Sequence, residues 1–197
     1  INKFHNVIAI SSFGKEFNNL KNQEGVKTIS LDMTRNISPI KDLISLIRMI
    51  KILKKECPDV VHSHTPKAGF ISMLASAYCK IPHRLHTVGG LPLMEAKGLK
   101  KKILIFTEWL TYKYATKIYP NSYGLKKYIL KNISVPKDKI LVIGYGSSNG
   151  IDTNYFTRSE KVKRDANLYI KKYSLENMFN FIFVGRIVKD KGISELS

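Results

Sequence analysis

The chain contains little cysteine, and this limits its chemistry. Among 197 residues there are two, Cys57 and Cys79, far apart and not arranged as a Cys-x-x-Cys pair. This argues against a disulfide framework and a structural zinc site, since both need grouped cysteines. A reducing, cytosolic setting is therefore the expectation.

Long hydrophobic runs are also missing. The longest uncharged stretch, residues 68–79, is much shorter than the ~20 residues that a membrane-spanning helix needs. Hydrophobic residues nevertheless make up 44% of the chain, which predicts a folded protein with a sizeable core. Because the sequence runs from Ile1 to Ser197 without an initiating methionine, we expect a piece of a longer protein.

Arginine is scarce in a chain that is otherwise strongly basic. The formal charge is +18, yet lysine supplies 27 of the 33 basic residues and arginine only 6. Base readout and bidentate phosphate binding favour arginine, and no zinc-finger, helix-turn-helix or RNA-recognition motif is evident. We therefore expect no nucleic-acid partner and attribute the charge to an anionic membrane surface or anionic substrates.

Short apolar segments alternate with helical patterns along the chain. This predicts a parallel sheet with helices on both faces, a doubly wound, Rossmann-like α/β fold. A charged, weakly apolar stretch at 157–172 marks a boundary, which we place to give domains 1–152 and 153–197. The predicted strands are 5–12, 26–31, 59–64, 83–88, 117–120, 140–143 and 177–184. The predicted helices are 15–24, 41–57, 69–78, 99–116, 123–131 and one from 191. Ser38 and Pro39 mark the start of the second of these helices, and Pro58 marks its end.

Site candidates follow the strands, because ligands of an open parallel sheet bind beyond the carboxyl ends of its strands. His62, His64 and His86 lie at or just after the ends of predicted strands, so a zinc site has to be considered. No HExxH motif, suitably spaced carboxylate or nearby cysteine accompanies them, so no metal site is predicted. His62 is the candidate for a structural histidine, whereas His64 and His86 are candidates for hydrogen bonding to a sugar or phosphate.

The segment GRIVKDKG, residues 185–192, carries the sharpest chemical signal. Gly185 allows a ligand to approach the backbone closely, and Arg186 can bind an anionic oxygen through its guanidinium group. Lys191 precedes a helix N-terminus, which also favours anions. Together they suit a diphosphate. The alternative is a basic surface turn in a lysine-rich chain.

Two predicted helices mix basic and apolar residues on one face. On a helical wheel, the basic residues of 41–55 fall within a single arc of about 140° that also contains Ile44 and Ile47. Lys97, Leu99 and the lysines at 100–102 crowd the start of the other helix. This composition suits the interface of an anionic bilayer. The alternative is solvated lysine over ordinary core-facing helices.

Four passages occur in a characteristic order: DVVHSHTPKAG (59–69), HRLHTVGGLPLME (83–95), GSSNGID (146–152) and FVGRIVKDKG (183–192). Over most of residues 6–192 the chain resembles family 4 of the retaining glycosyltransferases, which have the GT-B fold. It is most similar to bacterial enzymes that extend capsular, lipopolysaccharide or undecaprenyl-diphosphate-linked glycans.

The resemblance implies an acceptor-side N-terminal domain and the start of a second Rossmann-like domain that binds the donor, expected to be a UDP-sugar. It assigns the donor diphosphate to Gly185, Arg186 and Lys191, and no metal or other cofactor is expected because these cations replace it. It assigns the hinge to Asn149, Gly150 and Asp152. The acceptor side would comprise His64, Thr65, Lys67, His86 and Thr87, with His64 and His86 as candidate catalytic residues.

Two departures from the family pattern stand out. The family's first strand and its glycine-rich loop should precede residue 6, and this sequence does not contain them. Gly89 stands where many members have a histidine. The paired glutamates of the second domain, E-x7-E, are also missing, so we expect this stretch alone to be inactive.

The predicted function is retaining transfer of a sugar, with an N-acetylhexosamine as one candidate, from a UDP-sugar to a polyisoprenyl-linked or other cell-surface glycan acceptor. The enzyme is expected to be cytoplasmic and peripheral on the inner face of the cell membrane. One alternative is a non-catalytic, membrane-docking remnant of a disrupted gene. Another is a GT-B epimerase or phosphorylase.

Overall fold

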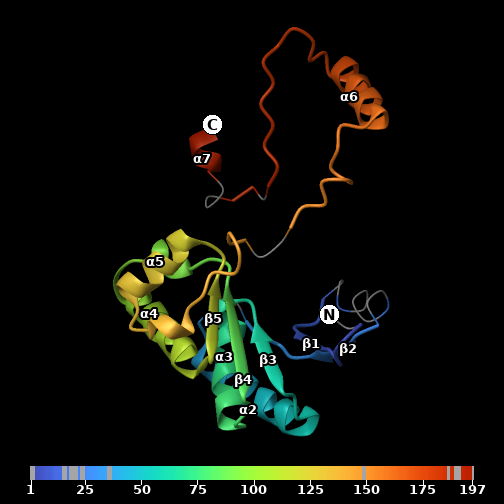
Figure 1. Cartoon of the computed structure of the whole chain (residues 1–197). Coiled ribbons are helices and arrows are strands. Elements are labelled where there is room, and N and C mark those ends of the chain that lie inside the picture. The colour runs from blue at the N-terminus through green and yellow to red at the C-terminus, as the bar shows by residue number, and fades with distance from the viewer. Residues whose placement is uncertain are drawn as a thin grey trace. The chain divides into compact units, whose positions relative to one another are not determined.

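The chain forms two compact units, Ile1–Asn149 and Gly150–Ser197. The computed structural model describes residues 3–14, 17, 22, 25–34, 37–147, 150–185, 187–188 and 192–196 (Figure 1). The predicted helix at 15–24 lies outside the described residues except for two positions, and the predicted boundary at residue 152 stays a prediction.

Parallel strands form the framework of the first unit. β1 (Ile8–Ser11) pairs with β2 (Lys27–Ser30). A second sheet has the order β3-β4-β5, from β3 (Val60–Ser63), β4 (His83–Val88) and β5 (Lys117–Pro120). Both pairings of this sheet are parallel, with Ser63 beside His86 and His86 beside Ile118. The α/β class with parallel strands, predicted from the alternating pattern, is confirmed.

Two predicted strands differ in the structure. At 140–143 a single parallel bridge joins Ile140 to Ile118, and Gly144 follows soon after. The segment 177–184 is not a strand, and its apolar residues are exposed. A strand is stable only beside a partner that takes its backbone hydrogen bonds, and the second unit has no strand among its described residues.

Proline and capping positions define two helices of this unit. α2 (Pro39–Glu56) begins after Ser38 as predicted and ends at Cys57, whose φ of 44° turns the chain out of the helix before Pro58. α3 (Pro66–Tyr78) begins three residues earlier than predicted, because Thr65 takes the N-cap position and Pro66 the first turn. Proline suits this position, where its missing N–H costs nothing.

Two 3₁₀ turns and two further helices complete the described part of the first unit. The short 3₁₀ turn η1 (Pro92–Met94) precedes α4 (Gly98–Tyr114), and α5 (Tyr123–Asn132) follows β5 directly. A second 3₁₀ turn, η2 (Lys137–Lys139), leads to the bridge at Ile140. α3 packs against β3 and β4 and also contacts both α2 and α4, so these three helices form one layer on the sheet.

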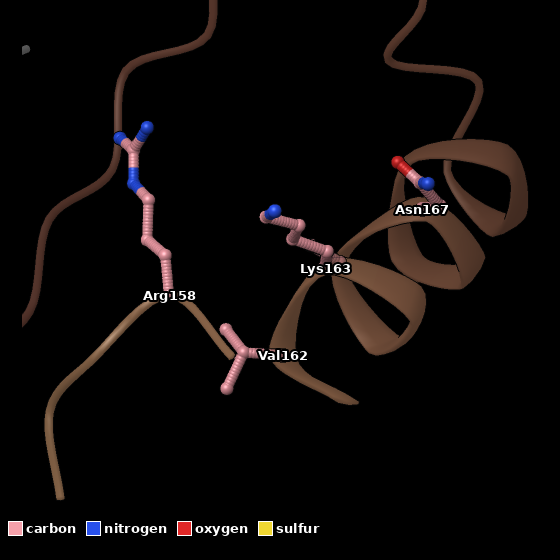
Figure 2. A pocket seen from close by; sticks show the side chains of 5 residues that line it. Arg158, Val162, Lys163 and Asn167 are labelled. Carbon is pink, nitrogen blue, oxygen red and sulfur yellow. The ribbon is translucent and has the colours of Figure 1, made fainter. Parts of the chain in front are cut away.

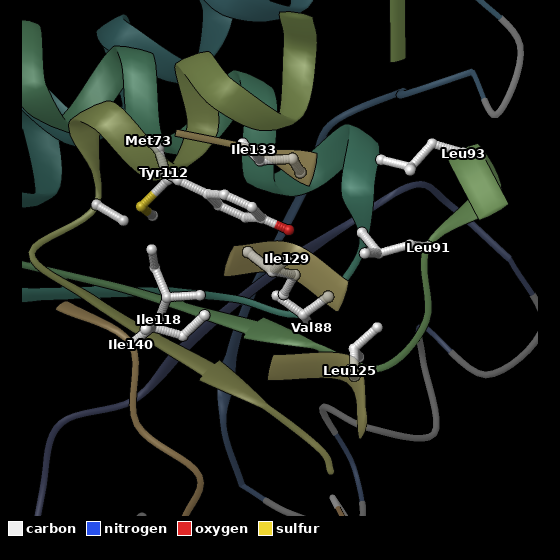
Figure 3. Packing of buried hydrophobic residues seen from close by; sticks show 11 residues of the cluster. Met73, Val88, Leu91, Leu93, Tyr112, Ile118, Leu125, Ile129, Ile133 and Ile140 are labelled. Atoms are coloured by element: carbon white, nitrogen blue, oxygen red, sulfur yellow. The ribbon is translucent and has the colours of Figure 1, made fainter. Parts of the chain in front are cut away.

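The core lies between this helical layer and the sheets. One cluster joins α2 and α3 through Met49, Leu53, Ile71 and Ala75, together with Leu31 and Ile81. The larger cluster surrounds Tyr112 of α4 and joins β4, β5, α3 and α5 (Figure 3). Its buried members are Met73, Val88, Leu91, Leu93, Tyr112, Ala115, Ile118, Leu125, Ile129, Ile133 and Ile140.

The second unit contains two described helices, α6 (Glu160–Lys172) and α7 (Ile193–Leu196). α6 was not predicted, because its sequence is charged and only weakly apolar. The signal that marks it is Ser159, whose hydroxyl accepts a hydrogen bond from the Val162 N–H at 3.3 Å and so caps the helix.

Candidate functional site

The carboxyl ends of β3, β4 and β5 lie at one edge of the sheet, because the three strands are parallel. Polar residues or glycines follow each of them: His64 and Thr65, Gly89 and Gly90, and Asn121 and Ser122. This is the edge at which open parallel sheets bind ligands.

Asn121 joins the loops at this edge. Its backbone N–H donates to the Val88 carbonyl at 3.1 Å, and its side-chain Nδ2 donates to the Gly89 carbonyl at 3.0 Å. Its own carbonyl accepts from the Ser147 N–H at 2.5 Å. Gly146 lies so close that a Cβ there would be 2.5 Å from the same oxygen. From the sequence alone Asn121 is only a polar residue that follows a strand, because its contacts come from distant segments.

The turn after Ile143 is held against the start of α5. Ser122 caps this helix by accepting from the Leu125 N–H at 3.1 Å. The Tyr123 hydroxyl donates to the Gly144 carbonyl at 3.2 Å. Together with Asn121, these bonds fix the backbone of 144–147 beside the ends of β4 and β5.

His86 lies in the core, not at the edge. Its side chain is 1% exposed, its Nδ1 lies 2.8 Å from the Ser63 hydroxyl, and its ring lies over Gly69 and beside Tyr112. Burial lowers its pKa from 6.5 to about 4, with smaller contributions from His62 and His64. The assignment of the structural histidine to His62 therefore needs correction, since His86 has this position. Such burial also keeps the imidazole from direct contact with an acceptor.

His62 and His64 lie together on the exposed side of the sheet. Their ring centroids are 4.2 Å apart, and Nε2 of His62 is 2.8 Å from the Thr87 hydroxyl. The edge of Tyr119 completes this cluster. The pKa of His62 is lowered, mainly because burial removes part of its hydration and also because His64 repels its positive charge. Two of the predicted acceptor-side residues, His64 and Thr87, are thus brought close to a histidine that was not assigned to the site.

Thr65 and Lys67 occupy different surroundings. Thr65 is exposed at the N-cap of α3, and its carbonyl accepts from the Gly69 N–H at 2.7 Å. The ammonium of Lys67 is held by Asp42 of α2 at 2.5 Å, and both side chains are largely buried. Lys67 therefore ties α3 to α2, and its charge is already neutralised.

A buried acid that the sequence interpretation did not identify lies one turn before Tyr112. Glu108 is 4% exposed on the inner side of α4, and burial raises its pKa to about 7, while its interaction with Tyr112 acts in the opposite direction. The pKa of Tyr112 is raised well above its ordinary value, first by burial and then by Glu108. Neither the Glu108 Oε2 nor the Tyr112 hydroxyl forms a hydrogen bond of normal geometry with a described residue.

The predicted donor loop is described only in part. Arg186, Lys191 and the hinge residue Asn149 lie outside the described residues. Gly185 is exposed, and a Cβ there would lie 3.0 Å from the Phe183 ring. Asp152 accepts from the N–H groups of residues 154 and 155 through its Oδ1, so it stabilises a turn at the start of the second unit. Gly150 is the first residue of this unit.

The described part of the chain also bears on metal binding and on surface hollows. It contains no group of three or more His, Cys, Asp or Glu side chains positioned to hold a metal ion. A hollow of about 420 Å³ lies along α6, lined by Arg158, Val162, Lys163, Ala166 and Asn167 (Figure 2). All of these side chains are exposed, so the hollow is an open surface of one helix and not an enclosed ligand cavity.

The sequence of this edge matches a known family. Residues 11–146 match the family model of the glycosyl transferase 4-like domain, which spans more than half of the chain and all three strand ends. The chain belongs to this family. The membership predicted from the four sequence passages is therefore confirmed.

Relatives of this glycosyltransferase domain include two curated bacterial enzymes. The chain is 41% identical over 189 residues to the capsular polysaccharide biosynthesis glycosyltransferase CapM of Staphylococcus aureus. The aligned region covers 95% of this chain and 47% of that protein. It is also 32% identical over 164 residues to the UDP-Gal:alpha-D-GlcNAc-diphosphoundecaprenol alpha-1,3-galactosyltransferase of Escherichia coli. Here the aligned region covers 81% of this chain and 40% of that protein. The chain thus spans less than half the length of these relatives.

A solved structure supports the fold of the domain. The crystal structure of a glycosyltransferase from Rickettsia africae aligns with a TM-score of 0.67 at 22% identity, covering 99% of this chain and 50% of that one. This agreement confirms the predicted Rossmann-like fold class.

Proposed function

We propose that the full-length protein is a retaining glycosyltransferase that moves a sugar from a UDP-linked donor to a polyisoprenyl-diphosphate-linked glycan. The observation that carries this proposal is the 41% identity to CapM, which covers 95% of the chain and therefore extends beyond the first unit. The name of the Escherichia coli relative gives a UDP-sugar donor and a diphosphoundecaprenol-linked acceptor, and this supports the same chemical classes here.

The acceptor is proposed to approach the strand-end edge of the first unit. His64 and Thr65 are exposed there, and the loops at Gly89 and Gly146 are held together by Asn121. A fixed backbone at this edge would position a sugar hydroxyl without a large ordering cost. The contribution of Lys67 would be indirect, because its ion pair with Asp42 holds α3 in place.

The donor diphosphate is proposed to bind at the loop 185–192. Arg186 offers a planar fork of donors and Lys191 a second cation, so the two can stabilise the negative charge that develops on the departing UDP. This arrangement needs no metal ion. Gly185 leaves room for the diphosphate to approach the backbone.

The experiment is a transfer assay on the full-length protein with a panel of UDP-sugars and a synthetic polyisoprenyl-diphosphate glycan. We expect Arg186→Ala to lower turnover by roughly 10² or more. Arg158→Ala is the matched control, because this arginine is exposed beside α6 and is not part of the predicted donor loop. Equal turnover of the Arg186→Ala and wild-type proteins would show that Arg186 is not part of the donor site.

Product analysis in the same assay separates transfer from the other reactions of this scaffold. A transferase gives UDP and an extended lipid-linked glycan, with the anomeric configuration of the donor retained. An epimerase would return an altered sugar without using the acceptor, and a phosphorylase would require inorganic phosphate. Both curated relatives are named as glycosyltransferases, which favours transfer.

A further inference from the structure

Tyr145 lies in the turn that follows Ile143, and its side chain is 102% exposed. An exposed fraction of this size means that the ring packs against nothing in the described part of the chain. Large aromatic side chains usually gain stability by leaving water. Because the ring of Tyr145 gains none in this way, packing within the first unit does not explain its position.

The backbone around Tyr145 is nevertheless held on both sides. The turn closes through a hydrogen bond from the Gly146 N–H to the Ile143 carbonyl at 3.0 Å. The hydroxyl of Tyr123 and the carbonyl of Asn121 hold the residues that flank the ring. A side chain on a fixed backbone binds a ligand with a smaller loss of conformational freedom than one on a loose loop.

The residues next to Tyr145 adopt a left-handed backbone. The φ angles are 55° at Gly144, 93° at Gly146 and 73° at Ser147. Glycine takes such angles freely, but serine does so at an energetic cost. A cost of this kind persists where surrounding contacts enforce it, and it is concentrated at binding and catalytic sites. The fold thus sets the shape of a turn that presents one aromatic ring.

This turn lies beside the ends of β4 and β5, at the edge where the acceptor is proposed to bind. Asn121 connects it to the loop at Gly89 through a hydrogen bond of 3.0 Å. Gly89 and Gly90 are exposed, and a Cβ added to either would meet nothing within 4 Å. His64 and Thr65 are exposed at the same edge. An aromatic ring, open space and polar groups therefore occur together here.

We propose that Tyr145 binds the acceptor directly, with its ring stacked on a sugar of the acceptor glycan; this inference rests on the proposed function. A pyranose carries hydroxyl groups around its rim and C–H groups on its faces, so it has an apolar face that a tyrosine ring can cover. Stacking removes both surfaces from water. The rim hydroxyls stay free to form hydrogen bonds with polar groups such as His64 and Thr65.

A sugar of the acceptor fits Tyr145 better than the uracil base of the donor. Tyr145 belongs to the first unit, whose strand-end edge is the proposed acceptor side, whereas residues 185–192 of the proposed donor site belong to the second unit. The two ligands also affect different kinetic constants. A lost acceptor contact raises the KM for the acceptor, and a lost donor contact raises the KM for the UDP-sugar.

The test is a steady-state transfer assay on the full-length protein with a water-soluble, short-chain polyisoprenyl-diphosphate glycan, in which acceptor and donor are varied separately. Tyr145→Ala should raise the KM for the acceptor roughly 10-fold, because the stacking contact and the buried ring area are lost. The KM for the donor and the turnover at saturating acceptor should stay at their wild-type values. Tyr145→Phe keeps the ring and should behave like the wild-type protein.

Tyr78→Ala is the matched control. Tyr78 is 65% exposed and ends α3, so it lies at the other end of this helix from the strand-end edge. This variant should keep both KM values, and Tyr145→Ala should unfold in urea at the wild-type midpoint. The proposal is overturned by an unchanged acceptor KM in Tyr145→Ala, by a rise in the donor KM, or by an equal effect of Tyr78→Ala. It is also overturned if Tyr145→Phe loses as much as Tyr145→Ala.

Binding of the glycan without any donor keeps this inference separate from the proposed function. Saturation-transfer NMR should detect the short-chain acceptor on the wild-type protein and much weaker binding to Tyr145→Ala. If the wild-type protein transfers no sugar, the proposed function fails, while the comparison of binding still decides the role of Tyr145. Equal binding to both proteins would refute that role even where transfer is observed.

Discussion

Glu108→Gln tests whether the buried acid of α4 is protonated in the folded protein. Glutamine keeps the size of the side chain but cannot ionise. Burial raises the pKa of Glu108 from 4.5 to about 7. Folding therefore favours the protonated form, and the wild-type protein loses stability as the pH rises through this window, because the unfolded chain releases the proton first.

The magnitude follows from the two pKa values. A rise from 4.5 to about 7 corresponds to ~3 kcal/mol of unfolding free energy. His86 acts in the opposite direction, since its pKa falls from 6.5 to about 4 and stability is lost as the pH falls through that window. In the wild-type protein the two effects largely cancel. Removing the Glu108 carboxyl should expose the His86 dependence, so the variant gains ~3 kcal/mol relative to the wild type between about pH 4 and pH 8.

The assay is urea unfolding of both proteins across this pH range, followed by circular dichroism and by the fluorescence of Trp109, the next residue along α4. The decisive quantity is the difference between the two unfolding free energies at each pH, because all other titrating groups are shared. Glu95→Gln is the control, since Glu95 is exposed in the same unit. If Glu108→Gln follows the wild type at every pH, the carboxyl is not held protonated and the reasoning from its burial is wrong.

Two glycine substitutions test close packing in the first unit. Gly69→Ala would place a Cβ 2.8 Å from Nδ1 of His86, so we expect a loss of about 1–3 kcal/mol in thermal unfolding. The helical control Gly124→Ala meets nothing within 4 Å and should be neutral or stabilising. Gly146→Ala combines a φ of +93° with a Cβ 2.5 Å from the Asn121 carbonyl oxygen, and should cost more than ~1 kcal/mol and weaken amide protection of Ser147. Gly144→Ala shares the positive φ but has open space; an equal cost for both would show that the Asn121 contact is unimportant.

Local sequence was sufficient to predict most elements of the first unit. Pro39 and Pro58 bracket α2, and the short apolar run before Gly89 predicted β4 at its observed bounds, His83–Val88. Such signals act through neighbouring residues, so they can be interpreted without knowing the fold. α6 escaped prediction because its apolar residues are few. The segment 177–184 has no neighbouring strand among the described residues of its unit, although its pattern requires one.

The candidate site could be located only in part. Placing polar residues after parallel strands identified the edge formed by His64, Gly89 and Asn121, because strand direction alone brings these ends together. The contacts of Asn121 with Gly89 and Ser147 join segments that are distant in the chain. No local pattern specifies them.

The sequence by itself determined the family, the parallel α/β class and the edge at which ligands should bind. Only the tertiary structure decided which side of each element faces the core. Alternation along β3 and β4 gives two faces of similar composition. Gly69 of α3 packs against the ring of His86, which selects this face for the core and leaves His62 exposed. The same holds for α4, where packing buries Glu108 and Tyr112 and leaves Leu99 and Phe106 exposed. Periodicity fixes which residues share a face, but the choice between faces depends on what the rest of the chain places against them.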